Sequence, residues 1–192
     1  MAKVTVTPEK FEMVFFDADE ITRIAEKVAE AVGLPDDTQV EINVDEAMMM
    51  GRSTVTIDGN RLVLDVMGGA FEDQRRARQM SAERTERLLA MKFMRARDRL
   101  DPDFGEPPAD ADVTPGQGIA WDVYSEGRLS RAGMGTRQQR LRYHFRVRHG
   151  FNDVADELFH RLWNADKLSW AEIQTIHETG TKNREELQAL AK

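Results

Sequence analysis

The residues best suited to chemistry are the cations of one short segment, residues 140–148. They occupy every second position of the segment: Arg140, Arg142, His144, Arg146 and Arg148. Guanidinium groups bind carboxylates and phosphates, often through two parallel hydrogen bonds. We therefore predict that these residues, together with the adjacent His149, bind an anion. The pattern indicates no particular reaction.

The secondary structure of segment 140–148 is open to two interpretations. As a strand, the alternation places the cations on one face, about 7 Å apart, and the apolar residues on the other. As a helix, the apolar residues form two separate ridges, Leu141 with Phe145 and Tyr143 with Val147. Residues 138–141 are good helix formers, whereas a period of two is typical of a strand. In either case we expect all four apolar side chains to be buried.

Charge is sorted along the chain around this segment. Residues 127–150 contain seven arginines and no acid, and residues 101–126 contain seven acids and no lysine or arginine. Adjacent blocks of opposite charge can neutralise one another in the folded protein. Only arginines without an internal carboxylate partner would then remain available to a ligand.

Composition excludes several classes of site. The chain has no cysteine, which rules out disulfides, thiolate nucleophiles, thiolate zinc sites and iron–sulfur clusters. Motifs for phosphate-binding loops and for nucleophilic serine are missing. Glu157 and His160 have the spacing found in carboxylate-bridged metal sites, but such sites need the pair twice. We predict that both side chains face solvent, and we predict no metal and no cofactor.

A second cationic stripe lies on the helix predicted for residues 81–100. Its members share one helical face: Arg84, Lys92, Arg95 and Arg99. The stripe is a candidate nucleic-acid surface, but we expect it to pair with the acidic first 66 residues. The formal net charge of −7 also argues against nucleic acid, because domains that bind it are usually basic.

Nothing in the chain predicts a membrane or secreted location. No window approaches the roughly 18 continuous apolar residues that read as a membrane-spanning helix. The first residues lack the apolar core of a signal peptide. We therefore expect a cytoplasmic protein.

The elements that must position these residues follow from apolar periodicity and capping. Residues 19–32, 81–100, 119–131 and 151–163 have helical spacing, and Ser169 opens a short helix with a capping box. Residues 7–9 also have the composition of a helix start. Residues 40–44, 54–57 and 61–66 are predicted strands, and Asp58-Gly59-Asn60 predicts a tight hairpin.

These elements predict an α+β protein. Its N-terminal half contains a small antiparallel sheet with helices, and its C-terminal half is helical. We expect an α+β core at 1–100 and an acidic connecting loop, rich in proline and glycine, at 101–118. A mainly helical part at 119–178 would pack on the core, followed by a tail at 179–192. We expect residues 48–50, three consecutive methionines, to pack partly on the core rather than form an exposed contact surface.

Two resemblances extend this interpretation. Residues 121–124, 142–146 and 148–151 (WDVY, RYHFR and RHGF) resemble segments of conserved bacterial proteins with no activity attached. Separately, the order helix, strand, hairpin, long helix in residues 19–100 resembles the layout of minimal zincin metallopeptidases. Where that family carries H-E-x-x-H on its active helix, this chain has residues 83–89 without a histidine. The resemblance therefore implies a zincin-like scaffold without its metal, and no catalytic residue carries over.

Three functional hypotheses follow. The first is a non-catalytic interaction protein that engages an acidic protein or a phosphate-bearing ligand through the arginine-rich segment 128–148. The second is an enzyme without short motifs, hydrolase-like or an inactive zincin-like scaffold, using His144 or His149 beside the arginines. It predicts a pocket with both signs of charge and a histidine of perturbed pKa. The third is nucleic-acid binding through the stripe on helix 81–100.

Overall fold

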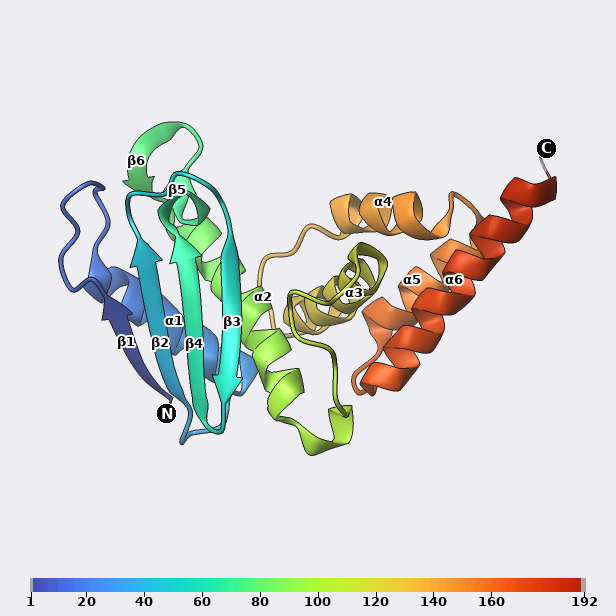
Figure 1. Cartoon of the computed structure of the whole chain (residues 1–192), viewed down its shortest axis with the longest axis horizontal. Helices are drawn as coiled ribbons and strands as arrows, with labels where there is room; N and C mark the ends of the chain where they lie inside the picture. Colours follow the sequence, from blue (N-terminus) through green and yellow to red (C-terminus); the bar gives the residue numbers. More distant parts are fainter. Residues whose placement is uncertain (1, 191–192) are drawn as a thin grey trace. The chain divides into compact units, whose positions relative to one another are not determined.

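A four-stranded mixed sheet forms the centre of the N-terminal part of the chain in the computed structural model, which describes residues 2–190. The strand order is β1-β2-β4-β3, with β1 Lys3–Thr7, β2 Gln39–Asp45, β4 Arg61–Met67 and β3 Ser53–Asp58 (Figure 1). The α+β class is confirmed. The hairpin β3–β4 is antiparallel as predicted, but β1–β2 and β2–β4 are parallel. The sheet is mixed because helix α1 (Ala18–Val32) connects β1 to β2 by a crossover, which parallel pairing requires.

One face of this sheet is covered and the other is polar. Alternate residues of β2 and β4 are buried, among them Ile42 and Leu64, and helix α1 lies over the same face (Figure 1). The Asp17 carboxylate caps α1, and Gly33 ends it with a φ of 69°, a conformation that glycine adopts without strain. On the opposite face the side chains are mainly polar, because successive residues of a strand point to opposite sides.

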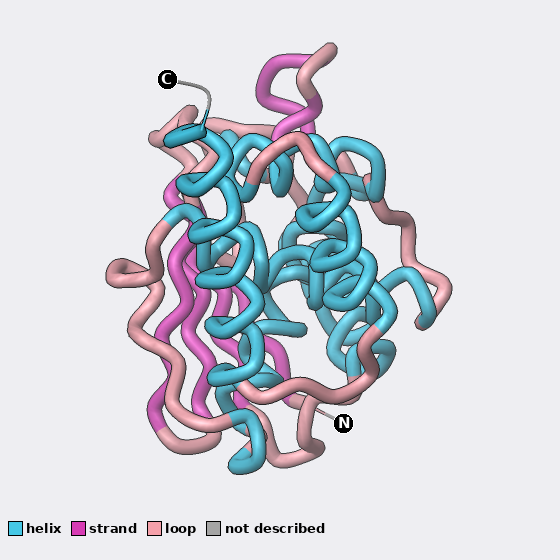
Figure 2. The backbone as a smooth tube through the Cα atoms, turned by 90° about the vertical axis from the view of Figure 1, so that its right-hand side faces the viewer, coloured by secondary structure: helices cyan, strands magenta, loops and turns pink. Residues whose placement is uncertain are grey.

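Residues 7–9 do not begin a helix. Thr7 is instead the last residue of β1, where its backbone pairs with Asn43 of β2. A second, two-stranded sheet, which the sequence did not predict, joins β5 (Glu72–Asp73) to β6 (Arg76–Met80). This hairpin projects beyond the end of the larger sheet (Figures 1 and 2). Strand β6 forms an isolated bridge with Phe15, whose N–H donates to the Arg78 carbonyl at 2.8 Å.

The methionine run 48–50 is exposed, contrary to expectation. Met49 has 63% of its surface exposed and Met50 has 48%. The neighbouring backbone explains the outward direction, because the Gly69 N–H donates to the Met48 carbonyl at 3.1 Å. A Cβ on Gly69 would overlap the Met49 carbonyl, so the two segments meet backbone to backbone and leave no room for side chains between them.

Four helices form the C-terminal part of the chain: α3 (Pro115–Arg131), α4 (Gln138–His149), α5 (Asp153–Asn164) and α6 (Trp170–Leu190). The helices predicted at 119–131, at 151–163 and from Ser169 therefore exist, and segment 140–148 lies in the fourth, α4. The side chains of Trp121, Tyr124, Phe145 and Phe159 are fully buried in their shared core. Helices α3 and α5 cross closely at Gly127, where a Cβ would overlap the Trp163 carbonyl.

Helix α6 is longer than predicted. Ser169 and Glu172 form the predicted capping box, with the Ser169 hydroxyl accepting from the Glu172 N–H at 3.3 Å. The helix then continues to Leu190, so residues 179–190 are helical rather than a tail. Residues 184–190 are strong helix formers and no proline interrupts residues 179–190, which permits the helix to continue although its last turns are exposed.

The chain divides into two compact units between Arg97 and Asp98, inside helix α2 (Ala82–Leu100). The segment expected as a connecting loop, 101–118, belongs to the C-terminal unit. Phe104, in the short 3-10 helix Pro102–Phe104, is only 3% exposed and stacks on Trp121 with ring centroids 5.5 Å apart. The aromatic side chain anchors a segment whose composition alone is typical of a loop.

Candidate functional site

Segment 140–148 is a helix, which decides between the two interpretations left open by the sequence. Leu141 and Phe145 lie one turn apart and are buried, whereas Tyr143 is 58% exposed and Val147 is 42% exposed. The expectation that all four apolar side chains are buried was wrong for the second pair. At 100° per residue the two ridges face different directions, and only one can face the core of a helical bundle.

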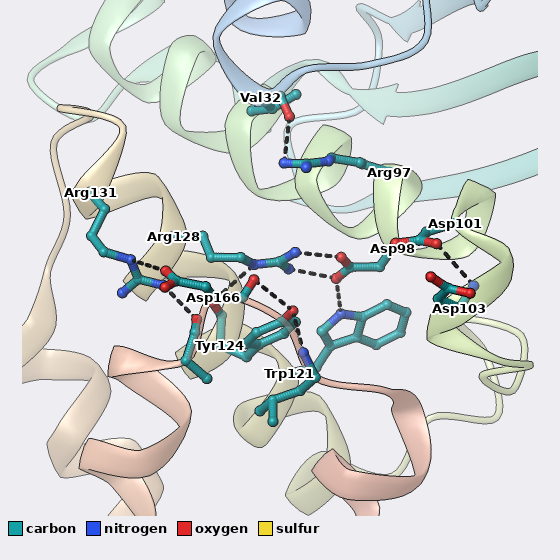
Figure 3. A network of polar contacts seen from close by, with 12 residues as sticks. Val32, Arg97, Asp98, Asp101, Asp103, Trp121, Tyr124, Arg128, Arg131 and Asp166 are labelled. Atoms are coloured by element: carbon teal, nitrogen blue, oxygen red, sulfur yellow. Dashed lines mark hydrogen bonds and ion pairs between the residues drawn. The ribbon is translucent and has the colours of Figure 1, made fainter.

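Arg128 is committed to an internal ion pair. Its guanidinium donates two hydrogen bonds of 2.7 Å to the Asp98 carboxylate, which also accepts from the Trp121 indole at 2.7 Å (Figure 3). The side chains of Arg128 and Asp98 are only 12% and 4% exposed, and the guanidinium lies 3.7 Å over the Tyr124 ring. Because both terminal nitrogens of Arg128 bind Asp98 and its side chain is largely buried, Arg128 holds α3 against the end of α2 rather than presenting its charge to a ligand.

Three further arginines of segment 128–148 have internal partners. Arg131 donates to the carbonyls of Trp163 and Ala165 and pairs with Asp166. Arg142 and Arg146, one turn apart on α4, share the carboxylate of Asp156 on α5. Hydrogen bonds from Arg146 and Arg142 hold the pKa of Asp156 well below its usual range.

The acids that pair with these arginines are not those of the preceding acidic block. Asp98 comes before residues 101–126, and Asp156 and Asp166 come after them. Sequence proximity suggested neutralisation by 101–126, but the helical packing brings α4 against α5 instead. From the acidic block, Glu126 accepts a hydrogen bond from the backbone N–H of Arg137 at 3.1 Å.

The remaining candidates lie on the exposed face of α4. Arg140, His144 and Arg148 are exposed beside Tyr143 and Val147. The Arg140 Nε lies 3.4 Å from the His144 Nε2. Within residues 2–190, Arg140 and Arg148 form no ion pair with a carboxylate. We call the set Arg140, Tyr143, His144, Val147 and Arg148 the α4 face.

His149 is separated from the α4 face by burial. Its ring is 0% exposed, its Nδ1 lies 3.0 Å from the Phe145 carbonyl, and its Nε2 lies 2.9 Å from Nδ1 of His177 on α6. Burial lowers the pKa of His149 to about 4, and burial also lowers the pKa of His177. Both histidines are therefore neutral near pH 7, and His149 contributes no positive charge toward an anion.

Two glycines make room for this histidine pair. A Cβ on Gly180 of α6 would lie 2.8 Å from Cδ2 of His149, and a Cβ on Gly116 of α3 would overlap the His177 ring. Gly116 lies in the first turn of α3, where the close approach of the His177 ring leaves no space for a Cβ.

A pocket of about 370 Å³ opens beside the last turn of α4. Its cations are Arg146 and Arg184, and its apolar wall is formed by Val147, Phe151 and Leu187. Arg184 Nη1 donates to the Arg148 carbonyl at 2.9 Å. No acid is among the residues that line this pocket, so it does not combine both signs of charge. His149 has the perturbed pKa that the enzyme hypothesis expects, but it does not line this pocket.

Two members of the cationic stripe on helix α2, Lys92 and Arg99, are engaged within the protein. Lys92 donates to the Ser53 carbonyl at 3.2 Å. Arg99 pairs with Asp110 at 2.7 Å and lies 5.0 Å over the Trp121 ring. The expected pairing with acids of the first 66 residues was wrong for Arg99, because its partner belongs to the segment that follows the helix.

The remaining sequence motifs form no site in the described part of the chain. Glu157 and His160 are exposed, as predicted. Across residues 2–190 no cluster of three or more histidine, aspartate or glutamate side chains is arranged to hold a metal ion. No helix among these residues combines the length and the apolar character needed to cross a bilayer.

Sequence reasoning missed the contribution of α6 to this region. Arg184 and Leu187 reach the pocket from α6, at least 32 residues further along the chain than the other residues named above, and the exposed Phe151 follows α4 after Gly150. The helical spacing of 151–163 had placed Phe151 on a buried stripe. It is 63% exposed because α5 begins only at Asp153, with Asn152 as its cap.

Comparison with known proteins assigns neither a family to this chain nor a function to this site. No family model matches the chain, and neither a curated protein nor a solved structure is significantly similar to it.

Proposed function

We propose that this chain is a non-catalytic binding protein that engages an acidic, amphipathic segment of a partner protein through the α4 face and the adjoining pocket. The observation that carries the proposal is the mixture of exposed apolar side chains and guanidinium groups on one surface. Arg140, Arg148 and Arg184 have no carboxylate partner within residues 2–190, and each lies next to an exposed apolar side chain.

The helical geometry of α4 supports this choice of surface. Residues 140, 143, 144 and 147 recur at three- and four-residue spacing, so they form a continuous stripe along the helix. Tyr143 continues the stripe toward Phe151, with the two ring centroids 5.8 Å apart. Aromatic and arginine side chains are enriched at the centres of protein interfaces.

The apolar component favours a protein segment over a phosphate-bearing small ligand. A phosphate would use the guanidinium groups but leave Tyr143, Val147, Phe151 and Leu187 in water. A segment with carboxylates on one side and apolar residues beside them would cover both. Exposed apolar side chains that lie together, rather than singly, mark interaction sites.

The experiment compares proteins retained from a native cell extract by the immobilised full chain. The test variant is R140E/R148E, and the matched control R75E/R76E reverses two exposed arginines of the β5–β6 hairpin. Proteins retained by the wild type and the control but lost in the test variant are identified. Their acidic segments are then synthesised and titrated calorimetrically against each protein.

We expect such a segment to bind the wild type and to lose about tenfold or more in affinity with R140E/R148E, because each attractive contact becomes a repulsion. A second variant, Y143S/V147S, should weaken the same segment without changing the charge. The proposal is wrong if folded R140E/R148E retains the same proteins as the control. It is also wrong if inorganic tripolyphosphate displaces the segment while Y143S/V147S binds it normally, which would indicate a phosphate site.

A further inference from the structure

The open face of the N-terminal sheet carries a second pocket, of about 550 Å³. It lies where the three parallel strands end, because Thr7, Asp45 and Met67 are the last residues of β1, β2 and β4. The antiparallel strand β3 begins at the same edge with Ser53. In sheets with parallel strands, ligands bind preferentially outside the carboxyl ends of those strands.

The strand register places a row of polar side chains across the floor of this pocket. Thr7 is paired with Asn43, Asn43 with Asp65, and Asp65 with Thr54. Side chains of directly paired residues lie on the same face, so the row crosses all four strands. The Asn43 amide donates to the Asp65 Oδ1 at 2.9 Å, which orients the carboxylate and leaves its Oδ2 for another donor.

A second carboxylate lies two residues further along β2. Asp45 is diagonal to Asp65 on the same face, and its Oδ1 accepts from the Ala47 N–H at 3.1 Å. Neither aspartate forms an ion pair within residues 2–190. At the other end of the face, by contrast, Glu41 is neutralised by Arg61 at 2.6 Å.

The pocket therefore combines unneutralised carboxylates with apolar walls. Pro8 and Met67 supply apolar side chains to the lining, and Arg52 is the one cation among the lining residues, against two carboxylates. The surrounding chain is also acidic, with 14 acids against 6 bases in residues 1–66. Such a surface attracts cations, and its volume lies in the range of small-molecule sites.

We infer that this pocket binds a small organic amine, with its ammonium group between Asp45 and Asp65 and its apolar part against Pro8 and Met67. An ammonium group has three donors, which the two carboxylates and the hydroxyl of Thr7 or Thr54 can accept. The site lies in a different unit from the α4 face and shares no residue with it. The tests of the two proposals are therefore independent of each other.

The test titrates the full chain with 2-phenylethylamine and with its neutral analogue 2-phenylethanol, followed by amide chemical shifts in NMR. We expect low-millimolar binding of the amine, with shifts at Thr7, Asn43, Thr54 and Asp65. We expect the alcohol to bind about tenfold or more weakly, because it lacks the charge-assisted hydrogen bonds. Equal binding of the two compounds, or no shift with the amine, overturns the inference.

The variants D65N and D45N keep the shape of the side chains and remove one charge each. Each should weaken the amine by about tenfold, whereas the control D58N, on the same face outside the pocket, should bind it within about twofold of the wild type. Undiminished amine binding by D65N and D45N contradicts the inference. So does displacement of the amine by equimolar Ca²⁺, which would make the pair of aspartates an inorganic cation site.

Discussion

Removing the guanidinium of Arg128 tests whether the buried ion pair holds the C-terminal unit together. An R128M variant keeps most of the aliphatic stem and leaves the Asp98 carboxylate with the Trp121 indole as its hydrogen-bond donor among the contacts described above (Figure 3). The Asp98 side chain is only 4% exposed, so water cannot readily replace the lost partner. An unpaired buried charge is among the most destabilising changes that a single substitution makes.

The expected loss follows from this burial. Breaking one side of a buried ion pair costs about 3–5 kcal/mol. The contact between the guanidinium and the Tyr124 ring, at 3.7 Å, disappears as well, so we expect the upper half of that range. With a urea slope of about 2 kcal/mol per molar, the unfolding midpoint should fall by roughly 2 M.

Tryptophan fluorescence during urea unfolding at pH 7 provides the measurement. All three tryptophans of the chain lie after residue 97, so their emission follows the unit that contains the ion pair. The cycle is completed by D98L and by D98L/R128M. Replacing both partners removes the uncompensated charge, so the double variant should be more stable than the sum of the single losses predicts, by several kcal/mol. The reasoning fails if R128M loses less than about 1 kcal/mol, or if the two single losses simply add.

Four further outcomes follow from the same unit. The pKa of His149 falls from 6.5 to about 4 on folding, so the unfolded chain binds more protons than the folded chain between these pH values. The contribution of His149 to the free energy of unfolding is therefore complete above pH 6.5, and that free energy decreases by about 3 kcal/mol as the pH falls to 4. Urea midpoints measured across this range should show the slope, and it should be largely lost in H149Q. G180A should destabilise the protein by about 1–3 kcal/mol because its Cβ would lie 2.8 Å from the His149 ring. G118A should stabilise it slightly, because its Cβ meets nothing closer than 3.6 Å. Equal urea midpoints for the two variants would contradict this packing. S169A removes the hydroxyl of the capping box and should cost about 1 kcal/mol in thermal unfolding followed by circular dichroism. F104A should lower the free energy of unfolding by about 3–5 kcal/mol in the fluorescence assay. An unchanged midpoint would mean that Phe104 does not anchor residues 101–118 to the core.

Local signals in the sequence were sufficient for most individual elements. Helix α1 has the predicted helical spacing and ends at Gly33, directly after the predicted range 19–32, and the hairpin turns at Asp58-Gly59-Asn60 between the predicted strands. The capping box at Ser169 forms as predicted. Each of these signals acts over a few residues, so no knowledge of distant parts of the chain is needed to recognise it.

Pairings between distant segments could not be predicted in the same way. The parallel pairing of β1 with β2 depends on where α1 returns the chain, and a five-residue strand carries little periodic signal of its own. The exposure of residues 48–50 depends on the backbone contact with Gly69. Neither partner is indicated by the local sequence.

For the arginine-rich segment, the sequence by itself determined the residue types, their alternation and the possibility that an internal acid neutralises some of them. Only the tertiary structure decided that Arg142 and Arg146 share Asp156, that Arg128 is buried on Asp98, and that Arg140 and Arg148 remain exposed. The physical reason is that a salt bridge requires two side chains within a few ångströms, and the packing of helices sets that distance independently of separation along the chain.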